Sequence, residues 1–313
     1  MTPIIDPIPA EVLEQELTKD LFLRQTNKAN NEIYVINARN APNILREIGR
    51  LREVTFRIAG AGSGNACDLQ SFDIEDDACE QLLVWNPDAK EIIGSYRFTW
   101  GNRVTFEENG QPHNNTAHLF HFSDKFSKEY LPYSLEMARA FVQPKYQTAE
   151  MGAKSLFALD NLWDGIGGLV ALNPQLKYLM GKVSVYCTMP KVARKAIFFY
   201  LDKYHGDREQ LLKSKQPETF TPEEIALYNE MFPDELTAKD NYKTLNNFVK
   251  SHGDKVPPLI HSYIELSSGM VTYGTCSDVD FGDCYDTAMT IELDKIHDNK
   301  RARYVESFVK NQI

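Results

Sequence analysis

The chain has 313 residues, 42% of them hydrophobic and 25% charged, which is enough apolar material to fill a core and excludes a disordered or fibrous protein. Its 34 basic and 44 acidic residues give a net charge of −10, so a general attraction to nucleic acid or anionic lipid is not expected. No apolar run approaches the roughly 18 residues of a membrane span, and the first residues lack the basic and apolar regions of a signal peptide, so we expect a soluble, cytoplasmic protein.

The first 64 residues predict a helix, a strand and a second helix. Residues 10–24 have helical periodicity, and residues 32–38 (EIYVINA) are rich in β-forming side chains. The second helix, capped by Asn43, carries an apolar stripe as far as residue 58 and ends in the glycine-rich segment 60–64 (GAGSG). A dinucleotide-binding loop follows a strand and opens a helix, so we interpret this segment as a mobile loop.

The central part of the sequence predicts alternating strands and helices. Residues 81–100 predict a β-hairpin with its turn at NPDAK, and residues 134–144 (SLEMARAFVQP) predict a strand that leads into a crossover. A helix over 152–168, a strand over 178–186 and a helix over 190–206 follow. This order indicates a mixed α/β architecture.

Residues 206–255 differ from the rest because they are polar, charged and helical in pattern. Thr221-Pro222-Glu223-Glu224 forms a capping box with proline in the first turn, so we predict a helical hairpin inserted into a single domain of residues 1–313. The α/β pattern resumes at 257–269 (PPLIHSYIELSSG) and in the strand 285–293 (YDTAMTIEL).

The cysteines and histidines do not indicate a metal centre. The five cysteines are odd in number and lack CxxC pairs, so we expect reduced thiols. His118 and His121 lie close together in HLFHF, but no carboxylate stands at ligand spacing, so we expect no metal site there.

Charged residues occur where the pattern predicts buried strand. Arg97 lies inside GSYRFTW, and Glu136 and Arg139 lie inside SLEMARAFV. Buried charges are costly unless they are paired, so these side chains should contact one another or line a cleft. For each residue alone, a structural ion pair is at least as good an interpretation as a catalytic role.

Taken together in order, these residues resemble a known family. The pattern consists of a helical Arg-x-x-x-Phe, an Asp pair, a Gly-x-x-Arg strand and a Glu-x-x-Arg-x-Phe strand: Arg52, Phe56, Asp68, Asp73, Gly94, Arg97, Glu136, Arg139 and Phe141. It is similar to the acyl-homoserine-lactone synthases and, more closely, to the ornithine-lipid and glycine-lipid N-acyltransferases, often called hemolysin-like acyltransferases. The likeness covers residues 32–202 and 256–293, where DVDFGDCYDTAMTIEL resembles the C-terminal signature.

The resemblance implies a GNAT-type acyltransferase fold and an amino-acid acceptor. The acyl donor it implies is a long, often 3-hydroxylated chain carried as acyl-phosphopantetheine on acyl carrier protein. The product would be a lyso-aminolipid precursor, and no resident cofactor or metal is expected. The chain departs from the pattern at Ala61, where a glutamate is usual, and at His261 and Glu265, where cations are usual. These departures leave both glycine and ornithine open as the acceptor.

Roles follow for the residues of the pattern. We expect Glu136 to act as the base that takes a proton from the amine, and Arg97 and Arg139 to hold carboxylates in place or to bind the acceptor carboxylate. Amides flanking Phe141 and Val142 would polarise the thioester carbonyl. The remaining members, Arg52, Phe56, Asp68 and Asp73, would form the N-terminal wall of the site.

Two further features concern the donor. The loop QTAEMGAK has one glycine, Gly152, and an acid, Glu150, so it suits the phosphodiester of a carrier protein better than the diphosphate of coenzyme A. Residues 165–201 contain no acid, and five cations there could dock an acidic carrier protein: Lys177, Lys182, Lys191, Arg194 and Lys195. A solvated helix face is the alternative interpretation of this interval.

Two other functions stay open. One is an acyl-homoserine-lactone synthase, against which the C-terminal signature and the 206–255 insertion argue. The other is a non-catalytic binding protein or a lytic protein, although a surfactant-like product, which could also bring the enzyme to a membrane surface, would explain lysis without a pore.

Overall fold

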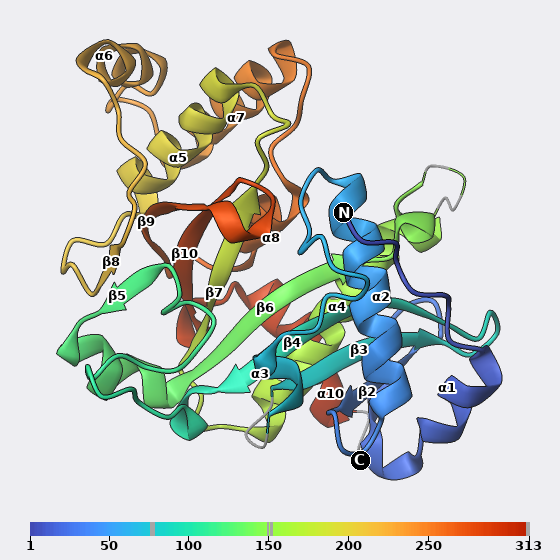
Figure 1. Ribbon diagram of the computed structural model, residues 1–313. Coiled ribbons are helices and arrows are strands. Elements are labelled where there is room, and N and C mark those ends of the chain that lie inside the picture. The colour runs from blue at the N-terminus through green and yellow to red at the C-terminus, as the bar shows by residue number, and fades with distance from the viewer. Residues whose placement is uncertain (76–78, 149, 151–152, 311–313) are drawn as a thin grey trace. The chain divides into compact units, whose positions relative to one another are not determined.

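The computed structural model describes residues 1–75, 79–148, 150 and 153–310. The chain divides into two compact units (Figure 1). Unit 1 comprises residues 1–103, 135–177 and 297–313, and unit 2 comprises residues 104–134 and 178–296. Within the described residues, every helix is too short or too polar to cross a membrane.

Unit 1 is built on an antiparallel sheet in the order β1-β2-β3-β4-β6. Its strands are β1 (Phe22–Gln25), β2 (Glu32–Ile36), β3 (Glu80–Asn86), β4 (Glu91–Trp100) and β6 (Ser134–Val142). The predicted strand at 32–38, the hairpin at 81–100 and the strand at 134–144 are confirmed.

Helices cover both faces of this sheet. On β3, Gln81 bonds to Arg52 of α2 (Pro42–Ile58), whereas the next residue, Leu82, lies against Gly165 of α4 (Ala153–Leu172). Because successive side chains of a strand point to opposite faces, α2 and α4 pack on opposite sides, as Figure 1 shows. Both helices and the strands between them carry fully buried apolar side chains, such as Ile48 of α2, Leu82 of β3 and Leu162 of α4.

The N-terminal segment corrects two predictions. The helix predicted over 10–24 ends early: α1 spans Ala10–Glu16, and β1 begins at Phe22. Pairing of β1 with β2, in which Phe22 lies opposite Tyr34, overrides the helical periodicity.

Asn43 is not the cap of α2. The helix begins at Pro42, and the amides of Asn43 and Ile44 donate to the carboxylate of Glu16, at 3.1 and 2.9 Å. A carboxylate satisfies the unpaired N–H groups of a helix N-terminus and interacts favourably with its dipole. The cap is therefore supplied by a residue of α1, distant in sequence.

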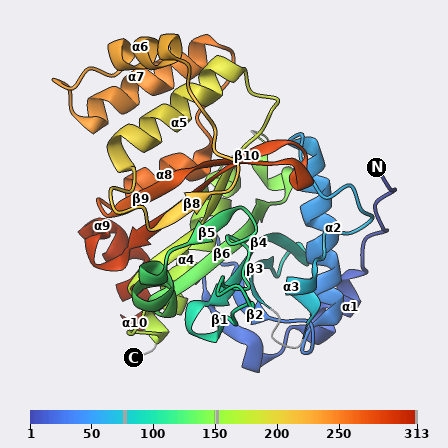
Figure 2. The same cartoon turned by 60° about the vertical axis from the view of Figure 1, so that its left-hand side comes forward.

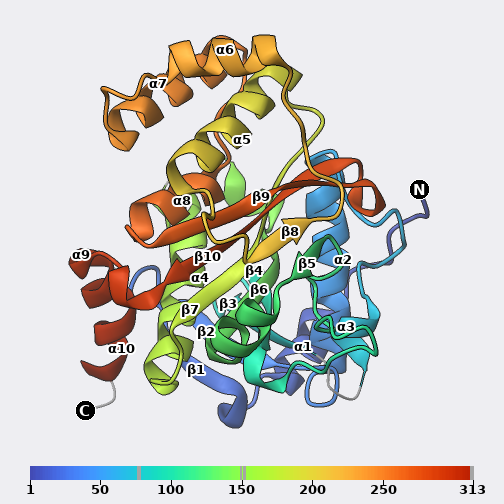
Figure 3. The same ribbon diagram turned by 90° about the vertical axis from the view of Figure 1, so that its left-hand side faces the viewer.

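In unit 2, three strands pair antiparallel in the order β7-β10-β9 (Figure 3). Its strands are β7 (Tyr178–Val185), β9 (Met270–Asp278) and β10 (Cys284–Glu292), and β5 (Phe120–Phe122) pairs with β8 (Leu212–Ser214). The strands predicted at 178–186 and 285–293 are confirmed, whereas β9 was not predicted. One face of this sheet contributes to an aromatic cluster that includes Phe120, Phe126 and Tyr273.

The α-helices of the described part of unit 2 are α5 (Lys191–His205), α6 (Pro222–Met231), α7 (Ala238–Ser251) and α8 (Pro258–Leu266). Within the interval 206–255 the chain forms β8, α6 and α7, and the latter two pack beside α5 (Figure 2). The predicted capping box is present, since the hydroxyl of Thr221 accepts from the amide of Glu224. The short helices α3 (Ser71–Ile74), α9 (Asp298–Arg301) and α10 (Ser307–Lys310) belong to unit 1.

Candidate active site

The strand register of unit 1 gathers polar side chains on the face that α2 covers. Arg97 lies opposite Gln81 on β3, and Thr99, two residues further along the same strand, lies opposite Glu136 on β6. Residues opposite one another in register, and residues two apart on a strand, share a face. Three separate strands therefore bring Gln81, Arg97 and Glu136 to one wall, where all three are buried.

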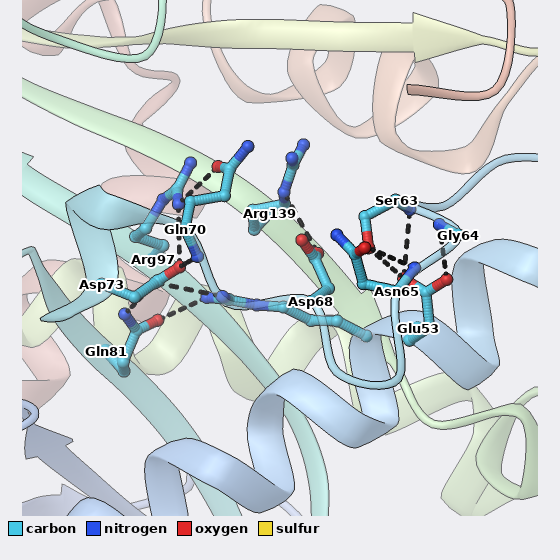
Figure 4. Close-up of polar contacts among 11 residues, drawn as sticks. Glu53, Ser63, Gly64, Asn65, Asp68, Gln70, Asp73, Gln81, Arg97 and Arg139 are labelled. Carbon is cyan, nitrogen blue, oxygen red and sulfur yellow. Dashed lines mark hydrogen bonds and ion pairs between the residues drawn. The ribbon is translucent and has the colours of Figure 1, made fainter. Parts of the chain in front are cut away.

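Asp73 of α3 is the centre of this wall (Figure 4). Its Oδ1 accepts from Nη1 of Arg52 at 3.1 Å and from Nε2 of Gln81 at 2.9 Å. Its Oδ2 accepts from Nη1 of Arg97 at 3.1 Å and from the amide of Gln70 at 3.0 Å. Each carboxylate oxygen of Asp73 therefore accepts two hydrogen bonds from groups of the protein.

These donors fix the charge of Asp73. Burial by itself would raise its pKa, but the guanidinium groups of Arg52 and Arg97 and the amide of Gln70 outweigh burial and hold the pKa at about 2. Asp73 is therefore a permanent anion between two arginines at physiological pH.

Arg97 experiences more than one carboxylate. Burial alone would lower its pKa, yet nearby acidic groups raise it; Asp73 has the largest effect, followed by Cys79, Asp68 and Glu136. Its Nη1 also donates to Oε1 of Gln70 at 2.9 Å. Arg97 is therefore paired with an acid that lies outside the two strands in which the sequence analysis found buried charges.

Arg139 lies at a bulge of β6. Between the pairs Ser95–Phe141 and Arg97–Ala138, β6 contains one residue more than β4, and Arg139 there has a left-handed φ of 51°. Nε of Arg139 lies 3.2 Å from Oδ2 of Asp68. A bulge with a non-glycine residue in this conformation redirects a side chain and is frequent at functional sites.

Gly94 makes room for this bulge. A Cβ atom at position 94 would lie 2.5 Å from the carbonyl oxygen of Phe141, and Gly94 pairs with Val142 in register. The backbone around Phe141 and Val142, whose amides we expect to polarise the thioester, is therefore positioned by the close approach of β4.

Two aromatic members of the family pattern, Phe56 and Phe141, have buried side chains in this unit.

The glycine-rich segment 60–64 is tethered, unlike the mobile loop that we expected. The carboxylate of Glu53 on α2 accepts from the amide and hydroxyl of Ser63, at 3.1 and 2.8 Å, and from the amide of Gly64 at 2.8 Å (Figure 4). Arg57 completes the arrangement by pairing with Glu53 at 2.7 Å. Glu53 was not among the predicted site residues, although a glutamate four residues before an arginine on a helix is a recognisable pair.

The comparisons with known proteins agree with this geometry. A profile described as the acetyltransferase (GNAT) domain matches residues 51–155, which contain the second half of α2 together with α3, β3, β4 and β6. A protein named glycine N(alpha)-acyltransferase from Phocaeicola vulgatus is 44% identical over 310 residues, which cover 99% of this chain and 94% of that protein. The chain belongs to this N-acyltransferase family. A second member with the same name, from Bacteroides thetaiotaomicron, is also 44% identical over 99% of this chain and 92% of its own length.

Two solved structures are more distantly similar to the acyltransferase. The CoA-dependent acyl-homoserine lactone synthase BjaI, with SAM and isopentyl-CoA, is 12% identical with a TM-score of 0.40, covering 89% of this chain and 90% of that one. FeeM, an N-acyl amino acid synthase from uncultured soil microbes, is 10% identical with a TM-score of 0.35, covering 84% and 92%.

The basic surface predicted on the acyltransferase does not form as expected. Arg194 and Lys195 are only 8% and 5% exposed. Lys195 pairs with Glu218 and Glu224, at 3.2 and 2.6 Å, and Arg194 donates to the carbonyl oxygen of Met189 at 2.9 Å.

Lys182 is also used internally, because it pairs with Asp286 at 3.1 Å across neighbouring strands. Lys177 and Lys191 are exposed. Three of the five predicted docking residues are therefore engaged within the protein, because acids from elsewhere in the fold pair with Lys182 and Lys195 and a backbone carbonyl accepts from Arg194.

The expectation that no carboxylate lies near His118 needs a correction. Nε2 of His118 lies 3.2 Å from Oδ2 of Asp280, and the ligand atoms of His118, Asp278 and Asp280 lie within 4.8 Å of one another. A carboxylate does therefore stand near His118, brought there by folding from 162 residues away. All five cysteines are free thiols, as predicted.

Gly152, on which part of the donor argument rests, lies outside the described residues.

Proposed function

We propose that the chain transfers a long-chain, 3-hydroxylated acyl group from acyl carrier protein to the amino group of glycine, giving a lyso-aminolipid precursor. The full-length identity of 44% to two glycine N(alpha)-acyltransferases supports glycine as the acceptor. The observation that carries the proposal is the wall of buried arginines and carboxylates on one face of unit 1, within the segment that matches the acetyltransferase profile.

The chemistry needs an amine, a base and a polarised thioester. One proton leaves the glycine ammonium for Glu136, the amine nitrogen bonds to the thioester carbonyl carbon, and the C–S bond breaks. The carrier thiolate takes up a proton, and the second amine proton is lost as the amide forms. A positioned base contributes about 10²- to 10⁴-fold in rate, and backbone amides flanking Phe141 and Val142 would stabilise the oxyanion.

The carrier-protein donor is supported by the sequence of the loop QTAEMGAK, which is poor in glycine and contains an acid. A diphosphate needs several converging amides, whereas a phosphodiester carries a single charge. Because Lys182, Arg194 and Lys195 are engaged internally, they are not part of this proposal.

The test uses the purified full-length protein with equal concentrations of glycine, serine, ornithine and lysine. One 3-hydroxyacyl chain is supplied either on acyl carrier protein or on coenzyme A, and products are identified by mass spectrometry. We expect N-acylglycine as the main product and faster turnover with the carrier protein. A preference for ornithine or lysine would overturn the acceptor, and equal turnover with coenzyme A would overturn the donor.

A further inference from the structure

Two aspartates in the segment that follows the glycine-rich loop have opposite surroundings. Asp73 accepts four hydrogen bonds from protein groups. Asp68, five residues earlier, is just as buried at 1% exposure, yet neither of its carboxylate oxygens receives a hydrogen bond. Among the carboxylates of the described residues, it is the one with both oxygens buried and without a donor.

The contact of Asp68 with Arg139 does not replace those donors. Their shortest approach is 3.2 Å, from Nε to Oδ2, and it lacks hydrogen-bond geometry. Strong arginine–carboxylate pairs are bidentate, with two parallel N–H···O bonds. Other buried carboxylates of the unit are well supplied; Glu53, for example, receives bonds from Arg57, Ser63 and Gly64.

The backbone holds Asp68 in place without using its side chain. Its amide donates to the carbonyl oxygen of Gly49 on α2 at 3.0 Å. The fit there is tight, because a Cβ atom on Gly49 would lie 2.6 Å from Sγ of Cys67. A carboxylate that is fixed in position and receives no hydrogen bond from the protein can accept one from an N–H group of a bound ligand.

Its neighbour identifies the kind of donor. Arg139 is the more exposed member of the pair, at 13% against 1%. A guanidinium beside a carboxylate presents both charges within a few ångströms, which matches the carboxylate and the ammonium of a free amino acid in reverse. We propose that Asp68 binds the amino group of the acceptor while Arg139 binds its carboxylate, so that the pair recognises a zwitterionic α-amino acid. The proposal rests on the proposed amino-acid acylation.

A competing interpretation gives Asp68 a positioning role, in which it only orients Arg139. The two roles predict different effects on an acceptor that lacks a carboxylate: direct binding by Asp68 affects its affinity, whereas orientation of Arg139 does not. Glycinamide retains the amine of glycine and lacks the carboxylate, so it reports on the amine contact alone.

The experiment measures KM and kcat for glycine and glycinamide with one 3-hydroxyacyl carrier protein. For Asp68→Asn we expect KM to rise about tenfold to a hundredfold for both acceptors, because a charge-assisted hydrogen bond to the amine is lost. For Arg139→Gln we expect a similar rise for glycine and little change for glycinamide. If Asp68→Asn affects glycine alone, Asp68 is a positioning residue and the proposal fails.

Two further variants keep the test decisive. Asp160→Asn removes a carboxylate that pairs with Arg303 elsewhere in the unit, and its KM should stay at the wild-type value. The double variant Asp68→Asn/Arg139→Gln leaves no charge unpaired, so it should fold even if a single variant does not. It should still lose glycinamide affinity, whereas a positioning role predicts wild-type affinity. Wild type that acylates no amino acid would refute the proposed function itself, a separate outcome.

Discussion

Asp73→Asn is the substitution that most directly tests the architecture of the charged wall. The change keeps the size of the side chain and removes the negative charge between two buried guanidinium groups. Arg52 and Arg97, each 3.1 Å from the carboxylate, would then face each other across a neutral amide. Removing one partner of a buried ion pair typically costs about 3 to 5 kcal/mol, since it leaves a buried charge uncompensated.

The pKa of Asp73 gives an independent magnitude. It lies at about 2, against an ordinary value of 3.8, and this difference stabilises the folded state by about 2 kcal/mol at neutral pH. Because the folded state lowers the pKa of this carboxyl group, the ionised Asp73 stabilises the folded state fully above about pH 4, and this stabilisation is lost as the pH falls through about 2. About half of it remains at pH 3.

Urea unfolding of wild type and Asp73→Asn at pH 7, 4 and 3 measures both quantities. We expect the variant to be less stable by about 3 to 5 kcal/mol at pH 7, with the gap narrowing by about 1 kcal/mol at pH 3. Asp124→Asn, which breaks an exposed pair with Lys128, should cost less than about 1 kcal/mol at any of these pH values. A gap at pH 7 below about 1 kcal/mol would refute the view that Asp73 holds the two arginines.

Three further substitutions separate chemistry from scaffold. Glu136→Gln should lower kcat about 10²- to 10⁴-fold with the melting temperature little changed; near-normal turnover from pH 6 to 9 would reassign Glu136 to a structural role. Gly94→Ala should lower kcat about tenfold or more, because its Cβ would displace the carbonyl of Phe141, now 2.5 Å from that position, and an unchanged kcat would show that the bulge does not place the reacting carbonyl. Glu53→Ala should increase hydrogen exchange at the amides of Ser63 and Gly64, and unchanged protection there would mean that the loop is held by other contacts.

Local pattern was enough to predict three of the elements that carry the wall, but not α3, on which Asp73 lies. The apolar stripe of α2, the turn of the β3–β4 hairpin and the proline after β6 are all local signals, and those three elements are confirmed. The early end of α1 and the strand β1 were missed, because pairing with β2 decides them and no local signal reports it.

Electrostatic partners were harder to predict than elements. Arg97 was recognisable as a charge inside an apolar strand, but its partner Asp73 is 24 residues away and reaches it only through the fold. The internal partners of the predicted basic surface were missed for the same reason. Lys182 and Lys195 pair with Asp286, Glu218 and Glu224, which lie outside the acid-free interval 165–201 and could not be paired with it from sequence.

Asp68 and Asp73 show what the structure adds to a family pattern. In the sequence they are equivalent members of an Asp pair, and both are buried. Asp73 is saturated with donors and its pKa is held at about 2, so any proton or ligand would have to displace a guanidinium group from it. Asp68 has one loose contact and no hydrogen-bond donor, so it can accept a new partner at little cost. The number of donors already bound, and not burial or sequence position, is therefore the property that separates the carboxylate that holds the wall together from the one that can take part in recognition.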